Sequence, residues 1–173
     1  MSAAQDIAME LGHDVDSDGD QFLTFMLAGE EYGVDILRVQ EIKGWDSVTP
    51  IPNTPDYIRG VINLRGTIVP IIDLRRRFAL DAIEYGPMTV VIVLKVFDSS
   101  GDNSRVMGVV VDAVSDVYNV QEDALKPAPD FGGDVDVAFV QGLASVNESM
   151  VIMLDIDRLL NSDELALVSG LSE

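Results

Sequence analysis

The acidic run DVDSDG at residues 14–19 is the first stretch whose spacing is suited to metal chemistry. It begins like the calcium-binding loop of an EF-hand, in which alternating oxygen ligands precede a glycine. Such a loop needs a bidentate carboxylate at its twelfth position, which here is Phe25, and its ninth position is Phe22. We therefore expect a solvated acidic tail, and keep a calcium-responsive binding module as an alternative function.

Paired carboxylates are the second candidate for chemistry. Asp112 with Asp116, and Asp155 with Asp157, are spaced closely enough to converge, but acid–base hydrolysis needs two carboxyl groups flanking a cleft at a defined separation. Among thirty acidic residues such pairs arise by coincidence. The single histidine, His13, lies in the acidic tail, and there is no cysteine, so triad chemistry and thiolate metal sites have no basis. We expect no catalytic residue, no metal site and no cofactor, with a small acidic hydrolase as another alternative.

The charge of the chain is strongly negative and unevenly distributed. The net charge is −19 and the isoelectric point is about 4.1, which disfavours nucleic acid and anionic lipid as partners. Seven of the eleven basic residues nevertheless fall within residues 35–80. This segment is either an interaction face for acidic partners or a region of local pairing with its own carboxylates.

Two features bear on location. No stretch of about 18 or more apolar residues is present, so we expect no membrane insertion. The first twenty residues contain acids and no Lys or Arg, unlike the basic start of a signal peptide. We expect a cytoplasmic protein.

The segment NTPDYIRGVINLRGTIVPIIDL, residues 53–74, combines glycines with arginines at a regular spacing. Gly60 and Gly66 permit positive φ or a close backbone approach. Arg59 and Arg65 are six residues apart, so simple strand alternation puts them on one face, where the rigid guanidinium fork suits carboxylate recognition. The alternative is a strand, a turn and a strand with two solvated arginines.

The rest of the chain is punctuated by turn residues every 8–12 positions. Residues 35–42 are compatible with a short helix or an irregular strand, and residues 53–58 with a short helix beginning near Pro55. Pro70 predicts an edge or bent strand, and Asp155 a helix N-cap. We expect helical residues at 73–78 and after 155, a possible sheet continuation at 116–120, and strands at 21–28, 60–64, 67–72, 88–97, 105–114, 137–146 and 150–154, with a hairpin turn at 29–30. Eight to ten short strands favour barrels or a sandwich, and at 173 residues two small barrels fit better than one large one.

Several segments, in order along the chain, resemble the CheW family. These are EEYGVDILRVQEIKG, NTPDYIRGVINLRGTIVPIIDLR, VVIVLKVFDSSGDNSRVMGVVVDAVSDV, LKPAPDFG and LDIDRLLNSDEL. The resemblance covers about residues 20–168. It implies a mainly β fold of two SH3-like five-stranded β-barrels around a shared hydrophobic region, with short helices and a C-terminal helix. The implied organisation is a flexible acidic tail at 1–20, one CheW-like domain of two subdomains at 21–168, and a C-terminal tail at 169–173.

The resemblance also implies a function and its sites. CheW-like proteins are non-enzymatic chemotaxis adaptors that bind the regulatory domain of the CheA histidine kinase and the cytoplasmic tip of methyl-accepting chemoreceptors, and are thereby recruited to membrane-associated receptor arrays. Positions that match the family's kinase contact are Leu23, Val34 and Leu37. They are expected to form a small exposed apolar patch, and the alternative is that they are ordinary core residues. Positions that match its receptor contact are Val39, Glu41, Gly60 and Arg65. Glu41 and Arg65 pair either with each other or with a partner.

Overall fold

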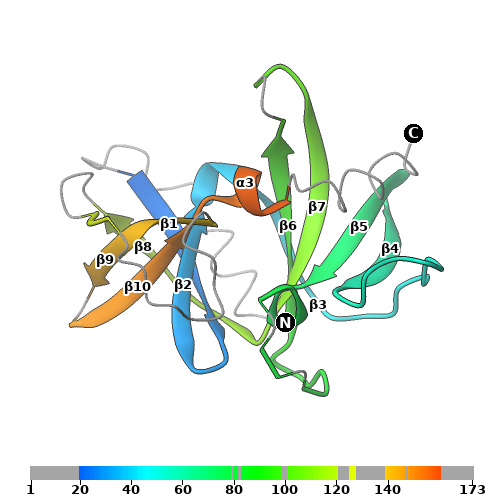
Figure 1. Cartoon of the computed structure of the whole chain (residues 1–173), viewed down its shortest axis with the longest axis horizontal. Coiled ribbons are helices and arrows are strands. Elements are labelled where there is room, and N and C mark those ends of the chain that lie inside the picture. Colours follow the sequence, from blue (N-terminus) through cyan, green and yellow to red (C-terminus); the bar gives the residue numbers. More distant parts are fainter. Residues whose placement is uncertain are drawn as a thin grey trace.

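The structure is a computed structural model in which residues 20–78, 80–81, 83–98, 101–120, 125–127, 139–146 and 148–160 are described (Figure 1). These residues form a mainly β fold of two five-stranded sheets, as predicted. Sheet A has the strand order β8(Ala113–Val120), β1(Asp20–Leu27), β2(Glu30–Asp35), β10(Ser149–Leu154), β9(Val140–Val146). Sheet B has the order β3(Val39–Gly44), β6(Val90–Phe97), β7(Ser104–Val111), β5(Thr67–Asp73), β4(Ile58–Leu64). The closure of each sheet into a barrel stays a prediction.

Sheet A is assembled from both ends of the described chain, whereas sheet B is assembled from its middle (Figure 1). The two halves of sheet A are joined by a parallel pairing of β2 with β10, in which Tyr32 lies opposite Ile152. The chain passes from sheet A to sheet B through a 3-10 helix, η1(Ile36–Arg38), and returns at Asp112, between β7 and β8. Residues 35–42 are therefore a helical turn followed by a strand, so each of the two interpretations of this segment holds for part of it.

Three hydrophobic clusters explain why the strands are so rich in Val, Ile and Leu. One cluster, which we call the shared core, contains residues from both sheets, including Phe25 of β1 and Ile92 of β6. A second cluster lies within sheet A and a third within sheet B. Along β6, Ile92 and Leu94 face the shared core while Val91 and Val93 face the sheet B cluster, because successive side chains point to opposite faces. The predicted burial of both faces of this strand is confirmed.

The hairpin of β4 and β5 turns at Arg65-Gly66, as predicted. Both residues have positive φ, 52° and 90°, as a two-residue type I′ turn requires, and the Gly66 amide donates to Asn63 Oδ1 over 2.8 Å. Pro70 was expected on an edge or bent strand. β5 is not an edge strand, because it lies between β4 and β7. Pro70 is tolerated because its missing N–H faces the β7 side, where the parallel ladder begins only at Ile71.

The remaining helices are short. Asp73 caps α2(Leu74–Arg77) by accepting from the Arg76 amide, and Asp155 caps α3(Ile156–Leu160) by accepting from the Arg158 amide over 3.2 Å. Both helix starts were predicted, whereas the helix predicted at 53–58 is wrong. That segment makes turns, because the Tyr57 carbonyl accepts from the Asp73 amide and draws the chain into the start of β4. In the described part of the chain, no helix has the length and apolar character needed to span a bilayer.

Candidate functional site

The most exposed charged pair of sheet B joins its two opposite edges. Arg65 Nη2 donates to Glu41 Oε1 over 2.6 Å, with Arg65 in the β4–β5 turn and Glu41 on β3. The Arg65 side chain is 73% exposed and that of Glu41 29% exposed. In this structure the two residues therefore pair with each other. Because Arg65 retains most of its solvent contact, it is also accessible to a partner carboxylate.

A backbone contact holds the same two edges together. Thr49, downstream of β3, exchanges two hydrogen bonds of 2.9 Å with Val61 of β4. Gly60 makes this approach possible: its φ is +144°, and a Cβ there would lie 2.3 Å from the Thr49 carbonyl oxygen. Gly60 is itself buried, so its evident task is to position the edge that carries Arg65.

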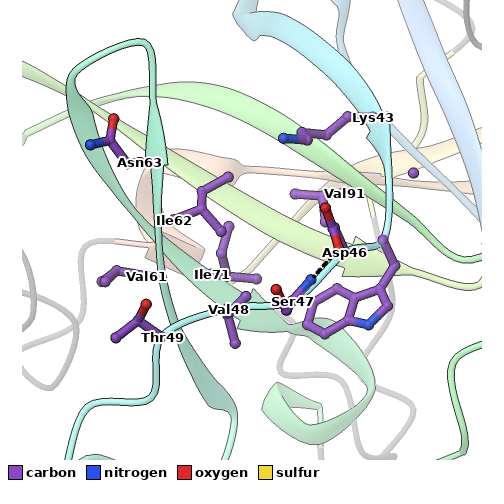
Figure 2. A pocket seen from close by; sticks show the side chains of 12 residues that line it. Lys43, Asp46, Ser47, Val48, Thr49, Val61, Ile62, Asn63, Ile71 and Val91 are labelled. Carbon is purple, nitrogen blue, oxygen red and sulfur yellow. Dashed lines mark hydrogen bonds between the residues drawn. The ribbon is translucent and has the colours of Figure 1, made fainter.

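A pocket of about 250 Å³ lies between these edges (Figure 2). Its floor is apolar, with Ile62, Ile71 and Val91, and polar side chains including Lys43 and Asn63 line it as well. Lys43 and Asn63 are each two residues from the members of the Glu41–Arg65 pair along their strands. Apolar side chains beside a few polar groups are a common lining of binding sites in proteins.

Val39 begins β3 opposite Leu94 and is partly buried against the shared core. All four predicted receptor-contact residues thus lie along the two edges of sheet B, with Glu41, Gly60 and Arg65 where the edges meet and Val39 at the start of β3. Arg59 does not join them on one face, since β4 has an irregular register between Ile58 and Gly60 and the Arg59 guanidinium rests over Tyr85.

The three residues predicted to contact a kinase differ sharply in exposure. Leu37 is 81% exposed, because η1 turns it outward while Ile36 packs against the shared core. Leu23 and Val34 are 0% and 1% exposed and lie opposite each other on β1 and β2. The expected exposed patch is wrong for Leu23 and Val34, for which the alternative of ordinary core residues holds, whereas Leu37 is exposed. The inner strand β1 is covered on one face by the shared core, and Leu23 and Val34 both point into it.

Two arginine–aspartate pairs, which the sequence did not reveal, join the sheets. Arg38 of η1 donates from both Nη atoms to Asp157 of α3, over 2.7 and 2.8 Å, and Asp157 also accepts from the Phe97 amide of β6. Arg75 of α2 donates from Nε and Nη2 to Asp112, over 2.8 and 2.7 Å. Asp112 Oδ2 in addition accepts from the Ala28 amide, in the β1–β2 turn, so each pair ties a part of sheet A to a part of sheet B.

The charge state of these carboxylates follows from their surroundings. Burial by itself raises the pKa of Asp112, but the hydrogen bonds from Arg75 and from the Ala28 amide outweigh it and lower the pKa below its usual value. The pKa of Asp157 is lowered in the same way, by Arg38 and the Phe97 amide against the effect of burial. Two of the acids considered for hydrolysis, Asp112 and Asp157, are thus committed to structural ion pairs.

The other chemical candidates gain no support. Phe22 and Phe25, at the ninth and twelfth positions of the calcium-loop pattern, lie in strand β1 and are buried at 4% and 0% exposure. An EF-hand loop therefore does not form across them. His13 and the acidic run at 14–19 lie outside the described residues. Within the described residues, no group of three or more His, Cys, Asp or Glu side chains is arranged to hold a metal ion.

Comparisons with known proteins add the final observations. A family model described as the CheW-like domain matches residues 21–164. The chain is 50% identical over 155 residues to chemotaxis protein CheW of Klebsiella aerogenes, covering 90% of each chain. It is 36% identical over 146 residues to chemotaxis protein CheW of Rhizobium meliloti, covering 84% of this chain and 90% of the relative. The crystal structure of scaffolding protein TtCheW from Thermoanaerobacter tengcongensis is similar with a TM-score of 0.74 and 34% identity, covering 88% of this chain and 94% of the other.

Proposed function

The chain belongs to the CheW-like domain family, and we propose that it couples chemoreceptors to a CheA histidine kinase in a signalling complex. As a CheW-type chemotaxis scaffold, it is an adaptor rather than an enzyme. The observation that carries the proposal is the 50% identity to a chemotaxis protein CheW over 90% of both chains. An adaptor needs two separable contact surfaces, and the two groups of residues below supply candidates for them.

The proposed kinase contact centres on Leu37. A large apolar side chain that is 81% exposed gains from being covered by a partner, and apolar anchors dominate the energy of many interfaces. Leu23 and Val34 belong to this surface only indirectly, as the buried support of the strand that leads to η1. We propose the regulatory domain of CheA as the partner.

The proposed receptor contact is formed by Glu41 and Arg65, with Val39 alongside and Gly60 as the residue that positions the β4 edge. An exchange of the Glu41 carboxylate for a carboxylate or carbonyl of the receptor tip would keep the Arg65 guanidinium satisfied. The partner is the cytoplasmic tip of a methyl-accepting chemoreceptor. We further propose a cytoplasmic location with recruitment to membrane-associated receptor arrays, without membrane insertion and without nucleic acid.

The test is reconstitution of the full chain with a cognate CheA and a receptor cytoplasmic fragment. We expect each partner to be retained separately in a pull-down, and CheA autophosphorylation to rise only when all three proteins are present. Leu37→Glu should reduce the retention of CheA and leave that of the receptor fragment unchanged. Arg65→Glu should reduce the retention of the receptor fragment and leave that of CheA unchanged.

Three outcomes would contradict the proposal. Failure to retain either partner would remove the adaptor role, and turnover of an ester or phosphoester substrate by the purified chain would favour the hydrolase alternative. Calcium-dependent heat in calorimetry, together with calcium-dependent partner binding, would favour the calcium-responsive alternative. Equal loss of both partners in one variant would mean that the altered residue supports the fold.

A further inference from the structure

Two arginines of sheet B and α2 are held by aromatic rings instead of carboxylates. The Arg59 guanidinium carbon lies 5.7 Å from the centre of the Tyr85 ring. The Arg77 guanidinium carbon lies 5.2 Å from the centre of Tyr57 and 4.7 Å from that of Phe139. The Nε atoms of both arginines are buried without a hydrogen-bond acceptor in the described structure.

Arg76 lies between these two arginines in the contact network. Its amide donates to Asp73, whose other carboxylate oxygen accepts from the hydroxyl of Tyr85, the ring beneath Arg59. The backbone amide of Asp73 in turn donates to the carbonyl of Tyr57, the ring beneath Arg77. Arg59, Arg76 and Arg77 are thus parts of one continuous structure, which we call the arginine–aromatic face.

The negative groups nearest this face are already committed. Asp73 is 3% exposed and accepts hydrogen bonds on both oxygens, and it stands 3.7 Å from Arg76 Nε. Burial and the hydrogen bond to Asp73 raise the pKa of Tyr85, so the hydroxyl stays protonated and keeps donating. Asp56 approaches Arg76 only to 3.8 Å and is 79% exposed.

Two other arginines of the chain have carboxylate acceptors for their guanidinium groups. Arg38 and Arg75 each make two short hydrogen bonds to one aspartate. Arg59 and Arg77 make no ion pair with any carboxylate in the described ranges, although the chain has thirty acidic residues. Stacking on rings fixes the planar fork of each and reduces the entropy lost when it binds a planar anion.

We propose that the arginine–aromatic face binds a carboxylate-rich segment of a partner protein. The guanidinium fork matches carboxylate geometry and can donate two parallel hydrogen bonds to one carboxylate. The net charge of −19 repels long polyanions such as nucleic acid at distance, whereas a short acidic segment needs only the local field. None of these arginines belongs to the proposed contacts of Leu37 or of the Glu41–Arg65 pair.

The test uses the full-length protein and a hexaglutamate peptide, with a hexaglutamine peptide as the uncharged control. Arginine Nε–Hε signals are followed by NMR during titration, at low salt and again at higher salt. We expect the Arg59 and Arg77 signals to move with hexaglutamate and not with hexaglutamine, and the affinity to fall as salt increases. Absence of movement at these two arginines would overturn the proposal, and this readout requires no variant to fold.

Variants then test whether charge at this face is responsible. Arg59→Gln combined with Arg77→Gln should weaken hexaglutamate binding by about tenfold or more. Arg158→Gln combined with Lys126→Gln removes the same charge from exposed positions elsewhere and should leave the affinity within about twofold. Equal weakening in both double variants would mean a non-specific charge effect and would refute the site.

Two further outcomes would reassign the occupant and so overturn the proposal as stated. If inorganic phosphate moves the two signals and hexaglutamate does not, the face recognises phosphate. If Asp14→Asn, Asp16→Asn and Asp18→Asn together move the signals in the absence of any peptide, the occupant is the chain's own acidic segment.

Discussion

The first two strands and the outer edges of sheet B were both expected to carry binding residues, but they place those residues in opposite surroundings. On β1 and β2, Leu23 and Val34 point into the shared core, whereas Leu37, beyond the end of β2, is exposed. At the edges of sheet B, Arg65 is largely exposed and paired with Glu41.

The difference follows from position within a sheet. The inner strand β1 has neighbouring strands on both sides and is packed on both faces, so substitutions of its side chains should mainly change the stability of the fold. Side chains at turns and outer edges remain in contact with water, so their substitution should mainly change the affinity for a partner. Substitutions in the two regions should therefore separate stability from partner affinity, and the expected losses of stability can be ranked.

The largest loss is expected for Val34→Glu. A carboxylate in the shared core has no partner, so the variant should fail to fold or lose about 4 kcal/mol or more of unfolding free energy. Leu37→Glu places the same charge in water and should change the stability by less than about 0.5 kcal/mol. Urea unfolding followed by circular dichroism distinguishes them. If the Val34→Glu protein is as stable as the wild type but no longer binds CheA, Val34 contacts the kinase directly.

Gly60→Ala should come next. Its Cβ would meet the Thr49 carbonyl oxygen at 2.3 Å in a backbone conformation that L-residues avoid, so we expect a loss of about 2–3 kcal/mol. Gly44→Ala is the matched control on β3, where an added Cβ meets no atom within 4 Å. Thermal unfolding of both variants gives the comparison. If Gly60→Ala keeps its Tm and still loses the receptor fragment, Gly60 contacts the receptor directly.

Asp112→Asn should have a smaller, pH-dependent effect of about 1–2 kcal/mol at neutral pH. Hydrogen bonds to charged groups contribute about 1.5–3 kcal/mol, and the Asn side chain can still accept one of them. The pKa of Asp112 is lower in the folded state than in the unfolded state, where it is about 4. The stability that the ionised Asp112 adds is therefore fully present above the unfolded-state pKa. It is lost as the pH falls through the lowered folded-state pKa. Urea midpoints of wild type and variant should therefore differ at pH 7 and converge under acid conditions.

Asp116→Asn is the control for this experiment, because Asp116 is exposed and its Oδ1 accepts from the adjacent Val117 amide. Its urea midpoint should follow the wild type across the pH range. A difference between wild type and Asp112→Asn that grows on acidification would contradict the assigned direction of the pKa shift.

Arg65→Ala should alter stability least, by less than about 0.5 kcal/mol, because exposed ion pairs contribute little. Its affinity for the receptor fragment should nevertheless fall by about tenfold, corresponding to about 1.4 kcal/mol, with CheA retention unchanged. A double-mutant cycle with Glu41→Gln separates the internal pair from the partner contact. If the single and double variants bind the receptor fragment with the same affinity as the wild type, Arg65 pairs only with Glu41 and does not contact the receptor.

Much of the fold could be predicted from residue patterns. The strand runs around 60–64 and 67–72, the turn at Arg65-Gly66, the helical turn within 73–78 and the cap Asp155 are all present. The apolar content of β6 predicted burial on both faces. These features depend on neighbours within a few residues, where steric preference and strand alternation act directly.

The sequence by itself determined which segments are strands, where they turn, and, through its likeness to a family, which residues deserved attention. Only the tertiary structure decided that β2 pairs with β10, that Leu23 and Val34 face inward, and that Arg38, Arg75 and Arg65 find Asp157, Asp112 and Glu41. Alternation shows that two side chains share a face but not whether that face meets water or a second sheet. Pairs separated by tens of residues form only when the whole chain brings them together, so no local pattern encodes them.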